Sequence, residues 1–308
     1  MEADEMSFIA ILIPIFLIFG LGYAGQKIFR LETKSLSIVA IYLMTPFLAF
    51  RTFYETEFNL DYAVMAIYTI GLALAIIAIV YAAAYFAGYS RKRTCAIILS
   101  SAFMNNGNYG TPLVLFAFGQ EGIKYAIVLM VIQQLLMCTL GVYYAAKGSI
   151  ENASFKTALK EVVRVPIVYG ALLGAALQFM NIPVSGTLME AVRMVGDAAI
   201  PTVMIILGIT LANISVKNLE IGPLSVSLTL RMVVSPLIAL AFTFFLPADT
   251  LLKQIMIVMA AMPSAANTTM YAVQYGTDPE LVSSVTLAST CLSLITLPII
   301  LYSVTFMQ

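Results

Sequence analysis

The most informative stretch of this chain is Ser100-Ser101-Ala102-Phe103-Met104-Asn105-Asn106-Gly107-Asn108-Tyr109-Gly110-Thr111-Pro112. It lies inside an apolar run, residues 95–118, that is long enough to span a bilayer. Its last eight residues include three asparagines, two glycines and a proline. Proline lacks the N–H that a helix interior needs, and glycine weakens helical order. We therefore expect no continuous helix through Asn105–Pro112.

A second stretch of this kind is Met262-Pro263-Ser264-Ala265-Ala266-Asn267-Thr268-Thr269. In the hydrocarbon layer, backbone groups freed by a break need partners, so a break survives only within protein or beside a water-filled cavity. Polar breaks at the middle of the membrane are typical of the binding sites of secondary transporters. The two stretches together therefore predict a transport site.

The composition is that of an integral membrane protein. Of the 308 residues, 61% are hydrophobic and 10% are charged, whereas a soluble domain is about 45–50% apolar and about 25% charged. The acidic N-terminus precedes an apolar run, which we interpret as a first membrane span rather than a cleaved signal peptide. The expected location is the cell (inner) membrane.

The absence of histidine excludes several kinds of chemistry. Ser–His and Cys–His catalysis, HExxH zinc sites and histidine proton relays all need this residue. The three cysteines lie in apolar segments, which argues against a metal cluster or a disulfide framework. The predicted spans also contain no evident pair of acidic residues at mid-membrane that could act as catalytic acid and base. We therefore expect no enzyme activity, no cofactor, no metal and no nucleic-acid partner.

Hydropathy predicts an all-α polytopic protein with ten transmembrane helices. The expected spans are residues 7–29, 35–54, 60–88, 94–118, 122–146, 162–180, 187–213, 221–246, 251–275 and 280–306. One alternating set of connections carries eleven lysines and arginines and the other carries four. The positive-inside rule places the richer set in the cytoplasm, and both termini are then extracytoplasmic.

The spans fall into two halves. The hydrophilic connection 147–161 separates a first five-helix repeat, residues 1–146, from a second, residues 162–308. A shift of about 152–157 residues pairs several prolines and glycines and overlaps the two broken stretches. Because each half has an odd number of spans, the halves insert with opposite orientation. This is the inverted-repeat plan of many secondary transporters.

These motifs resemble those of the auxin efflux carrier family, the bacterial relatives of the plant PIN-formed carriers. Asn105-Asn106-Gly107-Asn108-Tyr109-Gly110-Thr111-Pro112 is similar to the family pattern N-T-G-x-x-G-x-P, with Asn106 in place of the common threonine and Asn108 added. Met262–Asn267 in the ninth span and Arg231 followed by Pro236 in the eighth complete the resemblance, which covers the whole chain.

The resemblance implies the fold of the sodium–bile acid symporters. Helices 4 and 9 would break and cross, helices 3–5 and 8–10 would form a moving transport unit, and helices 1, 2, 6 and 7 would form a scaffold. It also implies a substrate that is a small organic anion, an auxin- or malate-like carboxylate, and a homodimer in the lipid bilayer.

Two asparagines are the leading candidates for substrate binding. Asn105 matches the family asparagine at the crossing, and Asn267 is its expected counterpart from the other repeat. An amide can donate to a carboxylate without burying a charge of its own, and helix N-termini beside the breaks favour an anion. In the alternative interpretation, both amides only cap broken helix ends. Further candidates are Asn106, Asn108, Thr268 and Gln133.

Four residues are interpreted as structural. Pro112 and Pro263 would hold the two breaks open, and Gly107 and Gly110 would let the broken segments approach each other closely. Thr268 has a second interpretation, a hydrogen bond back to its own helix.

Arg231 and Asp197 are charges predicted within spans, where an unpaired charge is costly. Arg231 would bind the carboxylate, pair structurally with Asp197 or form a gate with it. Asp197 is also the candidate for proton or cation coupling, unless Arg193 neutralises it from one turn away.

The sequence leaves three functions open. The leading one is a secondary transporter that moves a small organic anion by alternating access. The alternatives are a symporter or exchanger coupled to Na⁺ or H⁺, of the bile-acid-symporter type, and a sensor that binds its ligand without transporting it.

Overall fold

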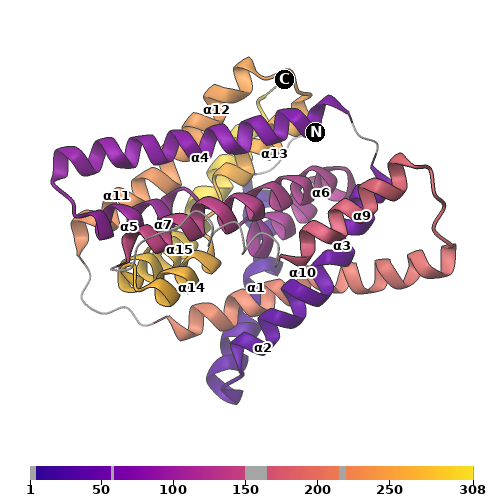
Figure 1. Cartoon of the computed structure of the whole chain (residues 1–308), viewed down its shortest axis with the longest axis horizontal. Coiled ribbons are helices and arrows are strands. Elements are labelled where there is room, and N and C mark those ends of the chain that lie inside the picture. Colours follow the sequence, from indigo (N-terminus) through magenta and orange to yellow (C-terminus); the bar gives the residue numbers. More distant parts are fainter. Residues whose placement is uncertain (1–4, 57–58, 150–164, 215–219, 308) are drawn as a thin grey trace.

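A computed structural model describes residues 5–56, 59–149, 165–214 and 220–307, with side chains of the first helix from Ala10 onward. The described chain is helical and contains no strand, only an isolated antiparallel bridge between Met104 and Ser264. Figure 1 shows the helices, some of which include π-helical turns (η). The elements are α1 (Glu5–Phe29), α2 (Thr33–Ile38), η1 (Val39–Met44), α3 (Thr45–Glu55), α4 (Leu60–Ala87), α5 (Arg91–Ser101), η2 (Asn106–Gly110), α6 (Thr111–Leu136), η3 (Met137–Gly141), α7 (Val142–Gly148), α9 (Pro166–Phe179), α10 (Gly186–Asn213), α11 (Ile221–Thr229), η4 (Leu230–Val234), α12 (Ser235–Phe245), α13 (Thr250–Ala260), α14 (Ala266–Tyr275) and α15 (Pro279–Val304).

The protein is an integral, multi-pass membrane protein. Within the described residues, seven helical segments are long and apolar enough to cross a membrane, and α9 and α13 are shorter apolar helices. The predicted fourth and fifth spans meet at Gly119, but the fourth is interrupted near its middle. Helix α5 ends at Ser101, and the chain is helical again over residues 106–148 except at Gly119, whose non-helical backbone (φ 67°, ψ −156°) divides α6 into two helices at the predicted connection. The ten-span inverted repeat stays a prediction, and most of the predicted connection 147–161 lies outside the described residues.

Two pairs of helices pack closely through glycines. On α1 and α10, a Cβ on Gly22 would lie 2.0 Å from the carbonyl oxygen of Ile205, and one on Gly208 would lie 2.0 Å from that of Phe19. On α9 and α3, a Cβ on Gly170 would lie 2.2 Å from the carbonyl oxygen of Pro46. Glycine is therefore required where these backbones touch, as small residues are at many membrane helix contacts.

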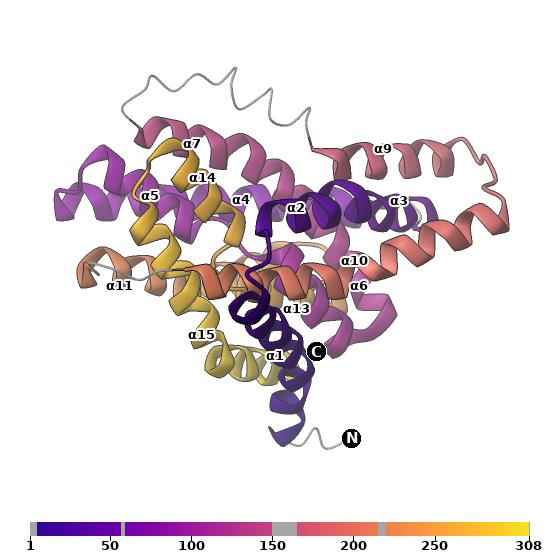
Figure 2. The same ribbon diagram turned by 90° about the horizontal axis from the view of Figure 1, so that it is seen from below.

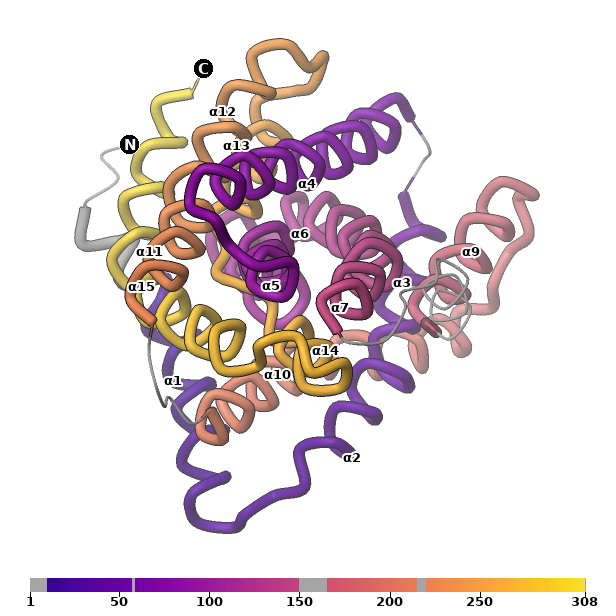
Figure 3. Tube along the Cα trace, turned by 60° about the vertical axis from the view of Figure 1, so that its left-hand side comes forward, coloured from indigo at the N-terminus to yellow at the C-terminus, as the bar shows by residue number. Residues whose placement is uncertain are grey.

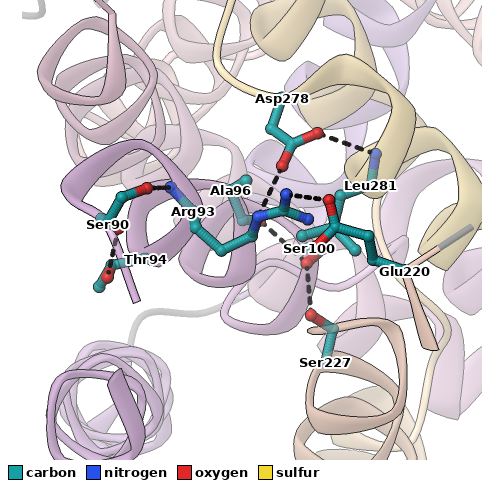
Figure 4. A network of polar contacts seen from close by, with 9 residues as sticks. All are labelled: Ser90, Arg93, Thr94, Ala96, Ser100, Glu220, Ser227, Asp278 and Leu281. Carbon is teal, nitrogen blue, oxygen red and sulfur yellow. Dashed lines mark hydrogen bonds and ion pairs between the residues drawn. The ribbon is translucent and has the colours of Figure 1, made fainter. Parts of the chain in front are cut away.

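A second group of helices surrounds α5. Figure 3 shows α5 end-on, with α4, α7, α11, α14 and α15 around it. Its residues from Thr94 to Ser101 are all buried. At its first turn, Arg93 forms ion pairs with Glu220 (2.6 Å) and with Asp278 (3.1 Å), the N-cap residue of α15 (Figure 4). Arg93 thus ties the start of α5 to the starts of α11 and α15.

Parts of these two groups lie at opposite ends of the molecule. In Figures 1 and 2, α3, α9 and part of α10 gather at one end, and α5, α7, α11 and α14 gather at the other. Helix α6 contacts α1, α3, α9 and α10 of the first group and α4 of the second, and it also contacts α13. Helix α6 therefore packs against helices of both groups.

Replacing Gly22 with alanine tests the backbone contact between α1 and α10. The added methyl group would overlap the carbonyl of Ile205, so we expect a loss of about 1–3 kcal/mol in stability. The measurement is the unfolding temperature of the purified protein in detergent. Gly20→Ala is the matched control, because a Cβ at Gly20 has nothing within 4 Å. Equal effects of the two changes would contradict the assignment.

Candidate functional site

Two interrupted segments meet in the interior. Helix α5 ends at Ser101 and η2 begins at Asn106, while α13 ends at Ala260 and α14 begins at Ala266. The residues between them pair as extended chain. The N–H of Asn105 donates to the carbonyl of Pro263 (2.9 Å), and the N–H of Ala265 donates to that of Phe103 (3.0 Å). Both segments are thus interrupted, and each satisfies backbone groups of the other.

The first interruption lies earlier than the sequence suggested. The chain is non-helical at residues 103–105 and is helical again from Asn106, through most of the stretch that was expected to break it. Pro112 stands in the first turn of α6, where a missing N–H is tolerated. No continuous helix therefore runs through Asn105–Pro112, but within this stretch only Asn105 is non-helical and Pro112 does not break the helix.

Arg231 binds the ends of both interrupted helices. It lies in η4 and is completely buried. Its Nη1 donates to the carbonyl of Ser101, the last residue of α5, at 2.8 Å. Its Nη2 donates to the carbonyl of Ala260, the last residue of α13, and to Ser235 Oγ. The guanidinium therefore lies where two helix C-termini place partial negative charge.

The predicted pairing of Arg231 with Asp197 is wrong. Asp197 accepts a hydrogen bond from Arg51 at 2.7 Å, and 62% of its side chain is exposed. Nor does Arg193 neutralise Asp197. It pairs with Glu55 at 2.9 Å and with Glu190 at 3.1 Å. The sequence had suggested acidic side chains as partners, but Arg231 uses backbone carbonyls instead.

A cavity lies where the interrupted segments meet. Its volume is about 50 Å³, which is room for a few water molecules. Five of the predicted binding residues line it, namely Asn105, Asn106, Asn108, Gln133 and Asn267, together with Gly107. None of the residues that line it carries a charge. The remaining lining residues are Ile41, Thr45, Leu48, Met104, Thr111, Met130, Gln134, Met137, Ile167, Ala199, Ile200, Val203 and Ala265.

Several buried polar atoms at this cavity have no hydrogen-bond partner among the described residues. They are Asn105 Nδ2, Asn106 Oδ1 and both amide atoms of Gln133. These three side chains are 4%, 3% and 2% exposed. An unsatisfied buried polar group costs about 1–3 kcal/mol, so such a cluster indicates atoms that are satisfied by a bound molecule or by water.

Two helix N-termini also face the cavity. The first hydrogen bonds of η2 run from the N–H groups of Tyr109 and Gly110 to Asn105 O. The N–H groups of residues 106–108 lie before these bonds and therefore have no acceptor within the helix. In α14 the first such bond joins Thr268 N to Ala265 O, and the N–H groups of residues 266 and 267 precede it. Free N–H groups and the helix dipole make such ends suitable for an anion.

Two predicted binding residues lie elsewhere. Arg231 is outside the lining of the cavity, at the other ends of the broken helices. Thr268 is also outside it and donates from its hydroxyl to Ala265 O at 2.7 Å, within its own helix.

The structural candidates hold the segments together. Pro263 accepts from Asn105 through its carbonyl. A Cβ on Gly110 would lie 2.8 Å from Met259 Sδ, so η2 approaches α13 closely there. At Gly107 the nearest atom, Met130 Sδ, would be 3.5 Å from a Cβ, an ordinary contact.

The sequence reasoning missed the opposite wall of the cavity. That wall comes from η1, α3, α9 and α10 and is apolar apart from Thr45, whose hydroxyl donates to Ala40 O at 2.6 Å. Its residues are ordinary apolar residues of membrane helices, so no composition signal distinguishes them. Only the packing of the two helix groups shows that they face the cavity.

Comparison with known proteins gives one family and several relatives. A family model described as "Membrane transport protein" matches residues 7–301. An "Uncharacterized transporter" of Methanothermobacter thermautotrophicus is 28% identical over 91% of this chain and 90% of its own length. A protein of Rhizobium meliloti with the name "Putative malonate transporter" is 24% identical over 95% of this chain and 94% of its own length.

Arg231→Gln is expected to destabilise the protein by about 3 kcal/mol or more, because charge-assisted hydrogen bonds are lost and buried carbonyls are left unpaired. The measurement is the unfolding temperature in detergent. Arg193→Gln removes an arginine from an exposed ion pair and should change this temperature little. An Arg231 variant as stable as the Arg193 variant would show that the helix ends do not depend on the guanidinium.

Proposed function

Because this chain belongs to the membrane transport protein family, the auxin efflux carrier family, we propose that it is a secondary transporter of a small organic anion. The anion, a carboxylate, would be held where the two interrupted segments meet and would be moved by alternating access. The observation that carries this proposal is the uncharged cavity in which unpartnered amides and two helix N-termini come together.

The chemistry of the cavity suits a carboxylate better than a cation. The unpartnered side-chain atoms are two donors, Asn105 Nδ2 and Gln133 Nε2, and two acceptors, Asn106 Oδ1 and Gln133 Oε1. The N–H groups of residues 106–108 and 266–267 add further donors, so donors outnumber acceptors. Hydrogen bonds to an ionised acceptor are about twice as strong as those between neutral groups. A carboxylate can accept several of them at once, and the dipoles of both helix ends would favour its charge.

The two walls of the cavity support alternating access. The polar lining residues other than Thr45 belong to the interrupted segments and to α6, whereas the facing wall of α3, α9 and α10 is apolar. A bound anion would therefore make its hydrogen bonds to one wall. That wall could move past the apolar wall without breaking them, because apolar contacts have no direction.

The spacing of the interrupted segments supports the inverted repeat. Helices α5 and α13 each have 11 residues. Thr250 follows Arg91 by 159 residues, and Ala266 follows Asn106 by 160 residues. Equal spacing of the helix starts before and after each break is expected of two copies of one unit, with their shared site between them.

The substrate class rests on the site and on one relative. The Rhizobium meliloti relative is named for malonate, a dicarboxylate, at 24% identity. The carboxylate groups of such an anion match the donors described above. The alternative, coupling to Na⁺ or H⁺ through Asp197, is less well supported, because Asp197 is exposed, paired with Arg51 and outside the lining of the cavity.

Asn105→Ala and Asn267→Ala are expected to abolish carboxylate transport, because each removes a donor to the bound anion. One such hydrogen bond is worth about 1.5–3 kcal/mol, which corresponds to a roughly 10- to 150-fold loss of affinity. The measurement is uptake of labelled malonate and malate into proteoliposomes. Asn213→Ala, at the end of α10 and outside the cavity, should transport normally. Normal transport by both cavity variants would refute the proposed site.

Asp197→Asn is expected to leave transport and its response to an imposed pH or Na⁺ gradient unchanged. The change removes only the charge of an exposed partner of Arg51, and exposed ion pairs contribute little to stability. Flux is compared in proteoliposomes with and without each gradient. Loss of gradient dependence in this variant would instead favour the coupled symporter or exchanger.

A further inference from the structure

A cavity outside the transport site lies in the corner between α4, α5 and α7. Its volume is about 330 Å³. It is lined by Tyr81, Ala84, Tyr85, Tyr89, Arg91, Thr94, Cys95 and Lys147. The positive φ of Gly88 (67°) ends α4 and lets the chain turn at once into α5, whose N-cap is Ser90. The corner is thus formed by a tight helix–helix turn with α7 against it.

The charge of this cavity is positive. Among the described residues, which leave out 150–164, Arg91 and Lys147 line it and no acidic side chain does. The nearby acids Glu220 and Asp278 are both bound to Arg93 (Figure 4). The first turn of α5 also borders the cavity, and a helix N-terminus adds partial positive charge. Two cations and a helix end therefore act on the same space.

Lys147 is held in place at the cavity. Its Nζ donates to Tyr81 Oη at 2.9 Å and lies 5.6 Å from the ring centre of Tyr143 and 5.7 Å from that of Tyr144. The end of α7 is fixed as well, since Thr277 donates to the carbonyl of Ala145 at 2.5 Å. A cation with a defined position loses less conformational entropy when it binds an anion.

The surroundings are those of a membrane surface. Tyr85 and Phe86, at the same end of α4, are 84% and 86% exposed, and the centres of their rings are 5.5 Å apart. Exposed aromatic residues at the end of a membrane helix are typical of the interface with lipid headgroups. Together with the basic residues of the first turn of α5, they place the opening of the cavity at headgroup level.

We propose that this cavity binds the phosphate group of an anionic membrane phospholipid. Arg91 and Lys147 would hold the phosphate, the tyrosines would surround the glycerol region, and Tyr85 and Phe86 would lie along the acyl chains. The lipid is favoured over a free anion because the cavity opens beside exposed aromatic residues. The site lies apart from the transport cavity and does not depend on the proposed function.

Binding of phosphatidylglycerol to the full-length protein, delipidated in detergent and observed by native mass spectrometry, tests this proposal. Each basic residue near an anionic lipid contributes about 1 kcal/mol, or about fivefold in affinity. We expect about fivefold weaker binding for Lys147→Gln and for Arg91→Gln. The double variant should bind about 25-fold more weakly, and phosphatidylcholine should bind weakly to all forms.

Lys124→Gln is the matched control, because Lys124 is an exposed lysine outside this cavity, paired with Glu121. It should bind phosphatidylglycerol as the unaltered protein does. Equal losses in the Lys124 variant, unchanged binding in the double variant, or displacement of the lipid by millimolar inorganic phosphate would each overturn the proposal. Should the glutamine variants unfold at a lower temperature, Arg91→Lys with Lys147→Arg should restore lipid binding.

Discussion

The architecture of the site depends on how one buried guanidinium satisfies two helix ends. Interrupting two helices inside a membrane protein leaves carbonyl groups at two C-termini and N–H groups at two N-termini without partners in their own helices. Arg231 binds the C-terminal carbonyls of Ser101 and Ala260 at once. Without it, these ends would be buried with their partial negative charge unopposed. A lysine, with its compact single ammonium group, does not offer the planar fork of donors that reaches both.

This arrangement also places the negative and the positive ends of the broken helices in different surroundings. Their negative ends point to the buried arginine, and their positive ends border the cavity, where Asn105 and Gln133 have unpartnered amide atoms. The chain thus creates an environment for an anion without placing a cation beside it.

The sequence predicted the membrane class, the two interruptions and most of the polar residues at the cavity, because asparagine, glycine and proline are conspicuous in an apolar run. It placed the first interruption too late, since the proline at Pro112 was read as a break although it stands in a first helical turn. It also gave Arg231 the wrong partner. Backbone carbonyls have no sequence signature, whereas Asp197 is visible in the sequence, and only the packing shows which of them is near. The apolar wall was unpredictable for the same reason.

Two groups of helices, each held together by its own contacts, border the polar cavity and its apolar wall. In one group, Gly22, Gly208 and Gly170 let backbones touch, so helices there cannot slide without steric overlap. In the other, Arg93 and Arg231 tie several helices together by charge-assisted hydrogen bonds. Across the cavity the groups meet through apolar side chains of α3 and α10. Dispersion contacts re-form at any offset, whereas hydrogen bonds and glycine contacts need one geometry. Relative movement in the proposed mechanism is therefore least costly at the boundary that contains the candidate site.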